Sequence, residues 1–271
     1  MPTARVATVE VVAWLTPRMV RVVLGGEDLA GFGAGEFTDH YVKLQFPPAG
    51  APYAPPFDPA EIKASLPREQ WPRMRTYSVR GFDAGRGRLT IDFVVHGDTG
   101  LAGPWAAAAQ PGDRIQFFGP GGAYAPDPAA PWHLLVGDPS VLPAIAASLA
   151  RIPAGVPVLV LVEVDGPEDE LPLETAGALD LRWVPREDGA LLAAVRALDL
   201  PDGPGQCFVH GEATPVREVR KHLLLERGVD PERLSVSGYW KRRRTEEEWR
   251  DDKAEWKRQA ELDTAGAAAP G

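Results

Sequence analysis

The character of the chain changes at a Pro-rich segment, residues 126–131, and this change predicts two domains of different class. Before the segment, short runs of alternating β-branched, aromatic and polar residues are separated by Gly and Pro. They predict at least six strands and one short helix, a pattern typical of a small antiparallel barrel. After it, strands alternate with helical runs, and the run 157–164 is apolar on both faces, which indicates a parallel sheet covered by helices. We therefore expect an antiparallel β-barrel over residues 1–126 and a parallel-sheet α/β domain over residues 127–240.

Residues 241–271 form a third segment, which begins with a basic run. Thr245 and Glu248 have the spacing of a capping box, so a helix is expected to begin there. The residues that follow at helical spacing are Trp249, Lys253, Trp256 and Ala260. They predict a C-terminal helix that packs on the protein through one narrow stripe. The Ala- and Gly-rich residues 264–271 are expected to fray.

Composition excludes several classes of function. The chain carries 38 Asp and Glu against 29 Lys and Arg, and this net charge of −9 argues against nucleic-acid binding through the whole surface. The N-terminus lacks the basic start and apolar run of a signal peptide, and no run of about 18 apolar residues is present to cross a membrane. A cytoplasmic protein is the simplest interpretation.

Cysteine and histidine usage gives no sign of a metal site or a catalytic side chain. Cys207 is the single cysteine, so an intrachain disulfide is excluded, and its apolar surroundings in the sequence predict a buried thiol. The five histidines are scattered without the spacing of a zinc site. No nucleophile–base triad is recognisable either, so we predict no metal and no catalytic residue.

The strand expected at residues 75–80, which Gly81 is expected to end, combines groups suited to a flat, phosphate-bearing ligand. Because side chains alternate along a strand, Arg75 and Tyr77 share one face. The Arg fork can bind a pyrophosphate, the Tyr ring can stack on a heterocycle, and Ser78 adds a small hydrogen-bonding group. The alternative is an ordinary strand with an exposed Arg and a half-buried Tyr.

The next expected strand, residues 88–96, leads into a Gly-containing loop that includes Gly100 and Gly103 and runs into the short helix expected at 101–109. Backbone N–H groups at such a helix start bind phosphate well. Together with the strand at 75–80, this loop favours a dinucleotide pyrophosphate held from two sides, over the alternative of a plain loop.

Seven motifs follow one another along the chain: residues 41–44 (YVKL), 75–80 (RTYSVR), 92–97 (DFVVHG), 119–124 (GPGGAY), 137–145 (GDPSVLPAI), 210–213 (HGEA) and 235–242 (SVSGYWKR). In this order they resemble the motifs of the siderophore-interacting protein family. The members of this family are FAD-dependent ferric-siderophore reductases of the ferredoxin-reductase-like superfamily. The resemblance extends over nearly the whole chain. It implies an FAD-binding barrel followed by an α/β domain that binds NADH or NADPH.

The resemblance also implies which residues bind the cofactors. They are Arg75, Tyr77, Ser78, Val79, Asp92, His96, Gly100, Leu101, Ala102, Trp105, Asp138, Ser140, Tyr239 and Trp240. Two positions depart from the family pattern. Pro139 stands where the family usually has an acidic or amide residue, which removes that side-chain hydrogen bond, and Leu101 stands where a Pro is common. We expect the second change to be tolerated, because the backbone does the binding there.

The substrate is expected to be a ferric siderophore, and the expected substrate-binding residues are Lys43 and Arg242. Many ferric siderophores are anionic, and the basic run 241–244, which Lys43 and Arg73 extend, supplies the opposite charge. Siderophores hold Fe(III) through hard oxygen ligands, so reduction to Fe(II) releases the metal. The alternatives are a solvated charge run, or a patch that docks an acidic electron donor such as a ferredoxin.

The sequence therefore predicts an FAD-dependent ferric-siderophore reductase with electrons from NADH, NADPH or a ferredoxin. One alternative is a general flavin-dependent reductase with another acceptor, and a second is a siderophore-binding protein without reductase activity. The choice between NADH and NADPH stays open at this point. The side chains that could serve a 2′-phosphate, or else be solvated, are Arg182, Arg186, Arg217 and Arg220.

Overall fold

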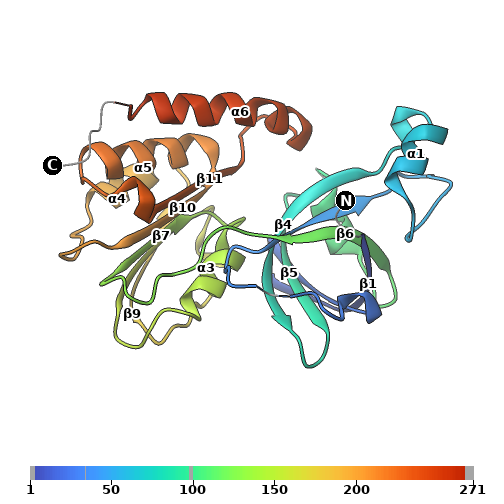
Figure 1. Cartoon of the computed structure of the whole chain (residues 1–271), viewed down its shortest axis with the longest axis horizontal. Helices are drawn as coiled ribbons and strands as arrows, with labels where there is room; N and C mark the ends of the chain where they lie inside the picture. The colour runs from blue at the N-terminus through green and yellow to red at the C-terminus, as the bar shows by residue number, and fades with distance from the viewer. Residues whose placement is uncertain (1–3, 34, 98–99, 266–271) are drawn as a thin grey trace. The chain divides into compact units, whose positions relative to one another are not determined.

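The computed structural model describes residues 4–33, 35–97 and 100–265, and the chain folds into two compact units (Figure 1). Unit 1 runs from Met1 to Ala123 and unit 2 from Tyr124 to Gly271. The division lies inside the 119–124 motif, close to the boundary expected at residue 126.

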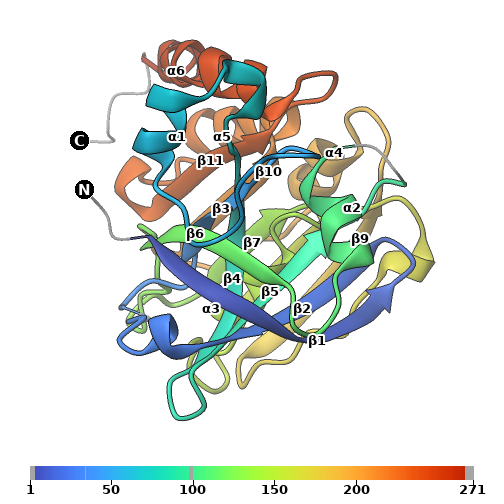
Figure 2. The same cartoon turned by 90° about the vertical axis from the view of Figure 1, so that its right-hand side faces the viewer.

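Unit 1 is a closed six-stranded barrel in which every neighbouring pair is antiparallel. The strands are β1 (Arg5–Thr16), β2 (Met19–Gly25), β3 (Tyr41–Phe46), β4 (Arg73–Asp83), β5 (Arg88–Val94) and β6 (Arg114–Gly121). They follow the order β1-β2-β5-β4-β3-β6 around the barrel, and β6 pairs with β1 to close it; Figure 2 shows them crossing around the interior. The predicted antiparallel barrel is confirmed.

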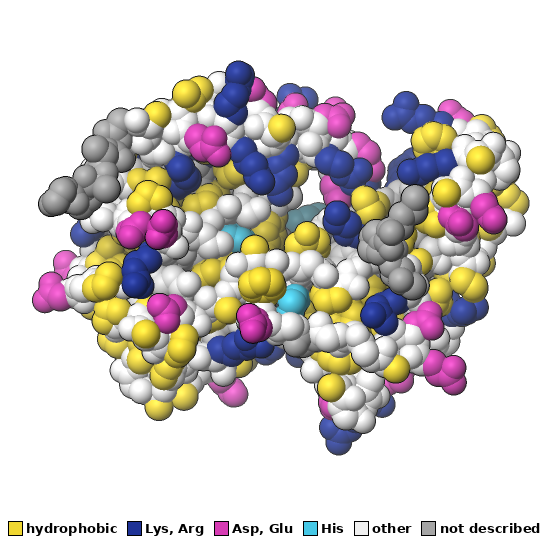
Figure 3. Space-filling model, viewed as in Figure 1, with side chains coloured by type: hydrophobic (Ala, Val, Ile, Leu, Met, Phe, Trp, Pro, Cys, Tyr) yellow, Lys and Arg dark blue, Asp and Glu magenta, His cyan; other side chains and the backbone are white. Residues whose placement is uncertain are grey.

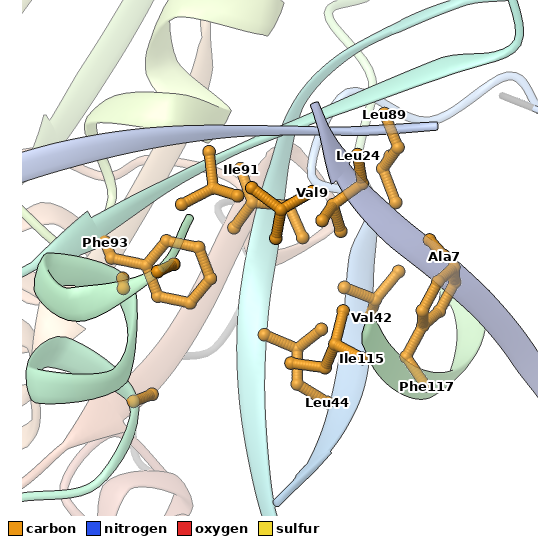
Figure 4. Packing of buried hydrophobic residues seen from close by; sticks show 14 of the residues in the cluster. Ala7, Val9, Leu24, Val42, Leu44, Leu89, Ile91, Phe93, Ile115 and Phe117 are labelled. Carbon is orange, nitrogen blue, oxygen red and sulfur yellow. The ribbon is translucent and has the colours of Figure 1, made fainter. Parts of the chain in front are cut away.

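The barrel closes around an apolar interior because alternate residues of each strand are large and hydrophobic. On β5, for example, Leu89, Ile91 and Phe93 are all fully buried. Figure 4 shows these side chains directed toward those of the other strands, such as Leu44 and Phe117. The short helix α2 (Ala102–Ala108) adds further buried side chains to this cluster.

Two segments of unit 1 differ from the sequence-based expectation. Strand β4 does not stop at Gly81 but continues to Asp83, with a shift of register between Val79 and Gly81 where β4 pairs with β5. A Gly inside a strand marks such a bulge as well as a stop. The Pro content of residues 47–72 predicts an irregular segment, but the segment includes helix α1 (Pro59–Ser65), which Asp58 caps.

Unit 2 is built on a five-stranded parallel sheet, as predicted. Its strands are β7 (His133–Gly137), β8 (Pro157–Val164), β9 (Ala178–Pro185), β10 (Gln206–Glu212) and β11 (Leu234–Trp240). Its helices are α3 (Leu142–Leu149), α4 (Ala190–Arg196), α5 (Ala213–Leu225) and α6 (Glu246–Leu262). Figure 1 shows α3 on the opposite side of the sheet from α5 and α6. The helices thus cover both faces of the apolar strands.

The order of the strands places a topological switch point in the middle of the sheet. The chain begins at β7 and proceeds outward through β8 to β9, then returns past β7 to β10 and β11, which gives the order β11-β10-β7-β8-β9. In open parallel sheets, ligands bind outside the carboxyl ends of the strands at the point where the order reverses. In unit 2 that point is the pair of loops after β7 and β10.

Helix α6 forms and docks as the sequence predicts. Thr245 and Glu248 make both hydrogen bonds of the capping box, and Trp249, Trp256 and Ala260 are buried. The Trp256 Nε1–H donates to the carbonyl of Ala213 at 3.0 Å. The stripe therefore attaches α6 to the start of α5.

Thr214 followed by Pro215 predicts that Thr214 is the N-cap of α5, but the structure differs. Glu212 is the N-cap, and its side chain accepts a hydrogen bond from the Thr214 backbone N–H at 2.7 Å. The helix therefore begins directly at the end of β10, at the switch point.

In the part of the chain that the structure describes, no helix has the length and hydropathy needed to span a membrane. Of the tail expected to fray, residues 266–271 lie outside the described residues.

Candidate functional site

Strand β4 carries the predicted Arg-x-Tyr-Ser motif between β3 and β5. The ring of Tyr77 is half-buried and packs on Phe93, with 4.4 Å between the ring centroids. Arg75, two residues before it, is also half-buried, and its Nη1 donates to the Met74 carbonyl at 2.8 Å. Ser78 is buried. The packing of Tyr77 on one aromatic neighbour fixes the ring and leaves part of its surface accessible.

Two neighbouring predicted residues have roles within the barrel itself. Val79 is a buried core residue whose backbone N–H donates to the His40 carbonyl at 2.6 Å. Asp92 is buried, and both of its carboxylate oxygens accept from Arg21, at 2.7 and 2.8 Å. Asp92 on β5 and Arg21 on β2 lie directly opposite each other. Asp92 is therefore the cross-strand partner of Arg21, which was not predictable from the sequence because the two positions lie far apart in the chain.

Helix α2 is held close to β5 by a glycine. A Cβ on Gly103 would lie 2.9 Å from the Val94 carbonyl oxygen, so only Gly allows this approach. Trp105 packs edge-on against Phe46 and tilted against Phe93, with centroid distances of 5.5 and 5.7 Å. Trp105 thus contributes to the barrel interior, and its contact with a cofactor stays a prediction.

The loop before α2 contains the predicted phosphate-binding backbone. Gly97 and Gly100 have positive φ angles of 56° and 89°, which Gly adopts without strain. Leu101 is half-buried, Ala102 is buried, and Gly100 is exposed. Residues 98 and 99 of this loop lie outside the described residues. The loop therefore presents Gly100 at the surface immediately before the helix.

A hollow of about 640 Å³ opens beside this loop. His96 is exposed at its edge, and further lining residues come from the end of β1, the β1–β2 turn and α2, among them Trp14, Arg18, Pro104 and Ala108. The exposed fraction of Trp14, 52%, is large for a tryptophan. Trp14 and Arg18 are not predictable as lining residues from the sequence, because the alternation along a strand does not show which outward residues border a hollow.

In unit 2, Asp138 forms the centre of a hydrogen-bond network at the switch point. It is buried, and its Oδ1 accepts from the backbone N–H and the hydroxyl of Ser140, at 2.8 and 2.6 Å. Its Oδ2 accepts from the Glu212 backbone N–H at 2.8 Å and from Trp240 Nε1 at 2.9 Å. A Cβ on Gly211 would lie 2.6 Å from the same Oδ2. Three of the predicted residues, Asp138, Ser140 and Trp240, are therefore brought together.

Tyr239 reaches this region from β11 through His210. The imidazole Nδ1 of His210 lies 3.2 Å from the Tyr239 hydroxyl, and its Nε2 lies 3.0 Å from the Ser235 hydroxyl. The ring stacks on Phe208 at 3.7 Å. Burial, with a smaller contribution from the charge of Lys253, lowers the pKa of His210 to about 3. His210 is therefore a neutral side chain that orients its neighbours.

Charged residues continue from the switch point to the carboxyl ends of β8 and β9. Arg186 Nε forms an ion pair with Asp165 Oδ1 at 2.7 Å, and its Nη1 lies 3.6 Å from Oε2 of the buried Glu163. The guanidinium also lies over the Trp240 ring, 5.8 Å from its centroid. Burial raises the pKa of Glu163, against the opposing effect of Arg186.

The two predicted substrate-binding residues are both exposed. Lys43 lies on β3 of unit 1, opposite Thr76 of β4. Arg242 follows β11 in unit 2, where its backbone N–H donates to Glu212 and its Nη1 pairs with Asp188 at 2.9 Å. Figure 3 shows acidic and basic side chains interspersed over the visible face rather than segregated.

Comparison with known proteins assigns the chain to a family. Two family models match, the siderophore-interacting FAD-binding domain over residues 8–124 and the siderophore-interacting protein domain over residues 130–243. The chain belongs to the siderophore-interacting protein family. The resemblance seen in the seven motifs is thereby confirmed.

The chain is similar to two reductases over most of its length. The ferric vibriobactin reductase ViuB of Vibrio cholerae is 34% identical over 89% of this chain and 90% of its own length. The NADPH-dependent ferric-chelate reductase of Escherichia coli is 31% identical over 81% of this chain and 86% of its own length. Among solved structures, the siderophore-interacting protein SipS of Aeromonas hydrophila superposes with a TM-score of 0.79 at 28% identity, covering 94% of this chain and 98% of SipS.

The residues of unit 1 fit the FAD that the family description names. Tyr77 offers a fixed aromatic surface and Arg75 a cation on the same strand. The loop that contains Gly97 and Gly100 supplies exposed backbone directly before α2, and Gly103 allows α2 to pack closely against β5. Among the described residues there is no group of three His, Cys, Asp or Glu able to hold a metal ion.

Proposed function

We propose that this siderophore-interacting protein is an FAD-dependent reductase that takes electrons from NADH or NADPH and reduces ferric siderophores, so that Fe(II) is released. The observation that carries the proposal is the joining, in one chain, of an FAD-binding barrel and a parallel sheet whose polar residues converge at the switch point. Relatives named as ferric reductases support the choice of reaction.

In unit 1, the proposed role of the β4 motif is to bind and orient FAD. Arg75 would hold the pyrophosphate, and Tyr77, held against Phe93, would contact the flavin. The backbone of residues 100–102, with His96 at the edge of the hollow, would line the rest of the cofactor. Bound FAD supplies the redox chemistry, because a flavin accepts a hydride and passes electrons on singly.

In unit 2, the proposed role of the switch point is to bind the nicotinamide dinucleotide. Asp138 holds the loop after β7, the start of α5 and the Trp240 ring in one arrangement. We propose that Ser140, Trp240 and Tyr239 border the dinucleotide, because ligands of such sheets bind outside the carboxyl ends of the strands at the switch point. No side chain of the switch point has to donate or accept a proton for hydride delivery.

Lys43 in unit 1 and Arg242 in unit 2 are each proposed to attract the anionic ferric siderophore. Arg242 pairs with Asp188, whose side chain is 95% exposed, and a pair so open to water is held weakly. An anionic ligand can therefore take the place of Asp188.

A ferredoxin as electron donor is a second candidate partner for the same basic side chains. Because NADH and NADPH are supplied in the cytoplasm, we place the reaction there.

Anaerobic spectroscopy tests the proposal. The flavin absorbance of the purified protein is recorded, NADH or NADPH is added, and ferric siderophores follow together with an Fe(II) chelator. We expect the flavin band to bleach, to return when the siderophore is added, and Fe(II) chelate to form. Bleaching that only another acceptor reverses would favour a general flavin reductase. A protein that takes up no FAD would contradict the proposal.

A further inference from the structure

We infer that this protein selects NADH over NADPH, and that the selecting element is a charge cluster at the carboxyl ends of β8 and β9, formed by Glu163, Asp165 and Arg186. The inference rests on the proposed use of a nicotinamide dinucleotide. It goes beyond that proposal because it names which of the two dinucleotides binds and which residues discriminate.

The charge cluster occupies the position at which dinucleotide-binding sheets recognise the adenosine ribose. In such sheets the pyrophosphate lies at the turn after the first strand, and an acidic residue at the end of the second strand binds the ribose 2′-hydroxyl. In unit 2 the first strand is β7 and the second is β8. Glu163 is the first β8 residue beyond the last pair with β7, Gly137 with Val162, and Asp165 directly follows the strand.

Contacts connect the charge cluster to the switch point. The Arg186 backbone N–H donates to the Val164 carbonyl at 2.9 Å, which holds Arg186 beside the end of β8. Its guanidinium lies over the ring of Trp240, and the same indole donates to Asp138. The charge cluster and the loop after β7 are therefore joined through one aromatic side chain, so a dinucleotide at the switch point reaches both.

The charge cluster has hydrogen-bonding capacity that the protein does not use. Glu163 is 2% exposed, and within the described part of the chain its Oε2 has no hydrogen-bond partner. Arg186 Nε likewise forms an ion pair with Asp165 but no hydrogen bond. Buried polar groups in native proteins are usually satisfied, and an exception calls for a ligand or another explanation. A ribose hydroxyl donates a hydrogen bond, which matches an unsatisfied carboxylate oxygen.

A 2′-phosphate does not match the charge cluster. It brings a charge of about −1.5 to −2 at neutral pH, and it would meet two carboxylates that already share one guanidinium. The neighbouring carboxylates of Asp138 and Glu212 act in the same direction, since both raise the pKa of Glu163, whereas Arg242 lowers it and is itself paired with Asp188. Like charges brought together in a binding site are a common way of rejecting the wrong ligand.

The other three arginines suggested for a 2′-phosphate are engaged elsewhere. Arg182 pairs with Asp180 on β9, at 2.7 Å. Arg217 pairs with Asp263, and Arg220 donates to the Ala260 carbonyl and to the Thr264 hydroxyl, so both attach α6 to α5. Arg186 is thus the cation nearest the expected ribose position among these four, and two carboxylates neutralise it.

Binding of two redox-inactive fragments tests the inference without using the reaction. Isothermal titration of the FAD-loaded protein with ADP-ribose and with 2′-phospho-ADP-ribose measures the ribose preference directly. We expect ADP-ribose to bind on the order of 10-fold more tightly, which corresponds to a difference of about 1.4 kcal/mol in binding free energy. Asp165→Asn, at a partly exposed residue, should raise the affinity for 2′-phospho-ADP-ribose and reduce this ratio severalfold. Glu163→Gln should act in the same direction.

Asp180→Asn is the matched control, because it also removes a carboxylate paired with an arginine near β8 but away from the charge cluster. It should leave the ratio unchanged. Equal or tighter binding of 2′-phospho-ADP-ribose by the unchanged protein overturns the inference while leaving the proposed reductase intact. Binding of neither fragment overturns the inference together with the nicotinamide part of the proposed function, and flavin bleaching by reduced ferredoxin then shows whether the reductase itself survives.

Discussion

At the residue scale, we expect two side chains of β4, Arg75 and Tyr77, to determine the affinity for FAD. Arg75→Ala removes the cation proposed for the pyrophosphate, and charge-assisted hydrogen bonds contribute about 1.5–3 kcal/mol each. We expect FAD affinity to fall by roughly 10-fold or more. Tyr77→Ala should also weaken binding. Titration of apoprotein with FAD, followed by flavin fluorescence, measures the dissociation constant.

Arg86→Ala serves as the control for Arg75→Ala. Arg86 is an exposed arginine in the β4–β5 turn that pairs with Asp83 at 3.0 Å. Its removal should not change FAD affinity. Should Arg75→Ala and Tyr77→Ala both retain FAD as tightly as Arg86→Ala does, the site lies elsewhere on the barrel.

His210 gives the protein a pH-dependent stability that its position in the sequence does not suggest. Its pKa is about 3 in the folded protein and near 6.5 when unfolded. Above pH 6.5 the His210 ring is neutral in both the folded and the unfolded state, so it causes no loss of stability. As the pH falls below 6.5, only the unfolded state takes up the proton, and stability decreases by about 1.4 kcal/mol per pH unit.

We therefore expect His210 to lower the free energy of unfolding by about 2 kcal/mol between pH 7 and pH 5. Urea denaturation at both pH values measures the change. His210→Gln removes the titrating ring, so the variant should lose less stability over the same interval. An identical pH dependence in the two proteins would show that His210 takes up its proton as readily in the folded state as in the unfolded state.

At the scale of elements, the packing of α2 on β5 depends on one missing methyl group. Gly103→Ala would place a Cβ 2.9 Å from the Val94 carbonyl oxygen, so the helix has to move. We expect a loss of about 1–3 kcal/mol in unfolding free energy, and weaker FAD binding because the preceding loop moves with the helix. Chemical denaturation and FAD titration measure the two effects.

Gly81→Ala is the matched control, since it adds the same methyl group to another glycine of the barrel. At Gly81 no atom of the described residues, other than those of Gly81 and its two chain neighbours, lies within 4 Å of the added Cβ, and its φ is not in the left-handed region. Its stability and FAD affinity should stay close to those of the unchanged protein. Equal effects of the two substitutions would mean that α2 is not held by close approach.

Elements whose signals are local were predictable from the sequence, and those set by distant partners were not. The capping box of α6 and the apolar run of β8 lie within a few residues, and both are confirmed. In contrast, Arg21 pairs with Asp92 from another strand, and the Glu212 backbone N–H and the Trp240 indole reach Asp138 from distant parts of the chain. Register and strand order decide such contacts, and a single sequence does not specify either beyond its family resemblance.

At the scale of the whole molecule, the two units should respond to different ligands. A ligand that binds only the folded state stabilises by about 2.7 kcal/mol at a concentration 100-fold above its dissociation constant. FAD should therefore raise the unfolding temperature of the unit that holds Arg75, and ADP-ribose that of the unit that holds Asp138. Differential scanning calorimetry with each ligand measures the two shifts, and Arg75→Ala should abolish the FAD shift while retaining the ADP-ribose shift. If Arg75→Ala instead removed both shifts, the dinucleotide would depend on bound FAD, and unit 2 could not be regarded as an independent binding unit.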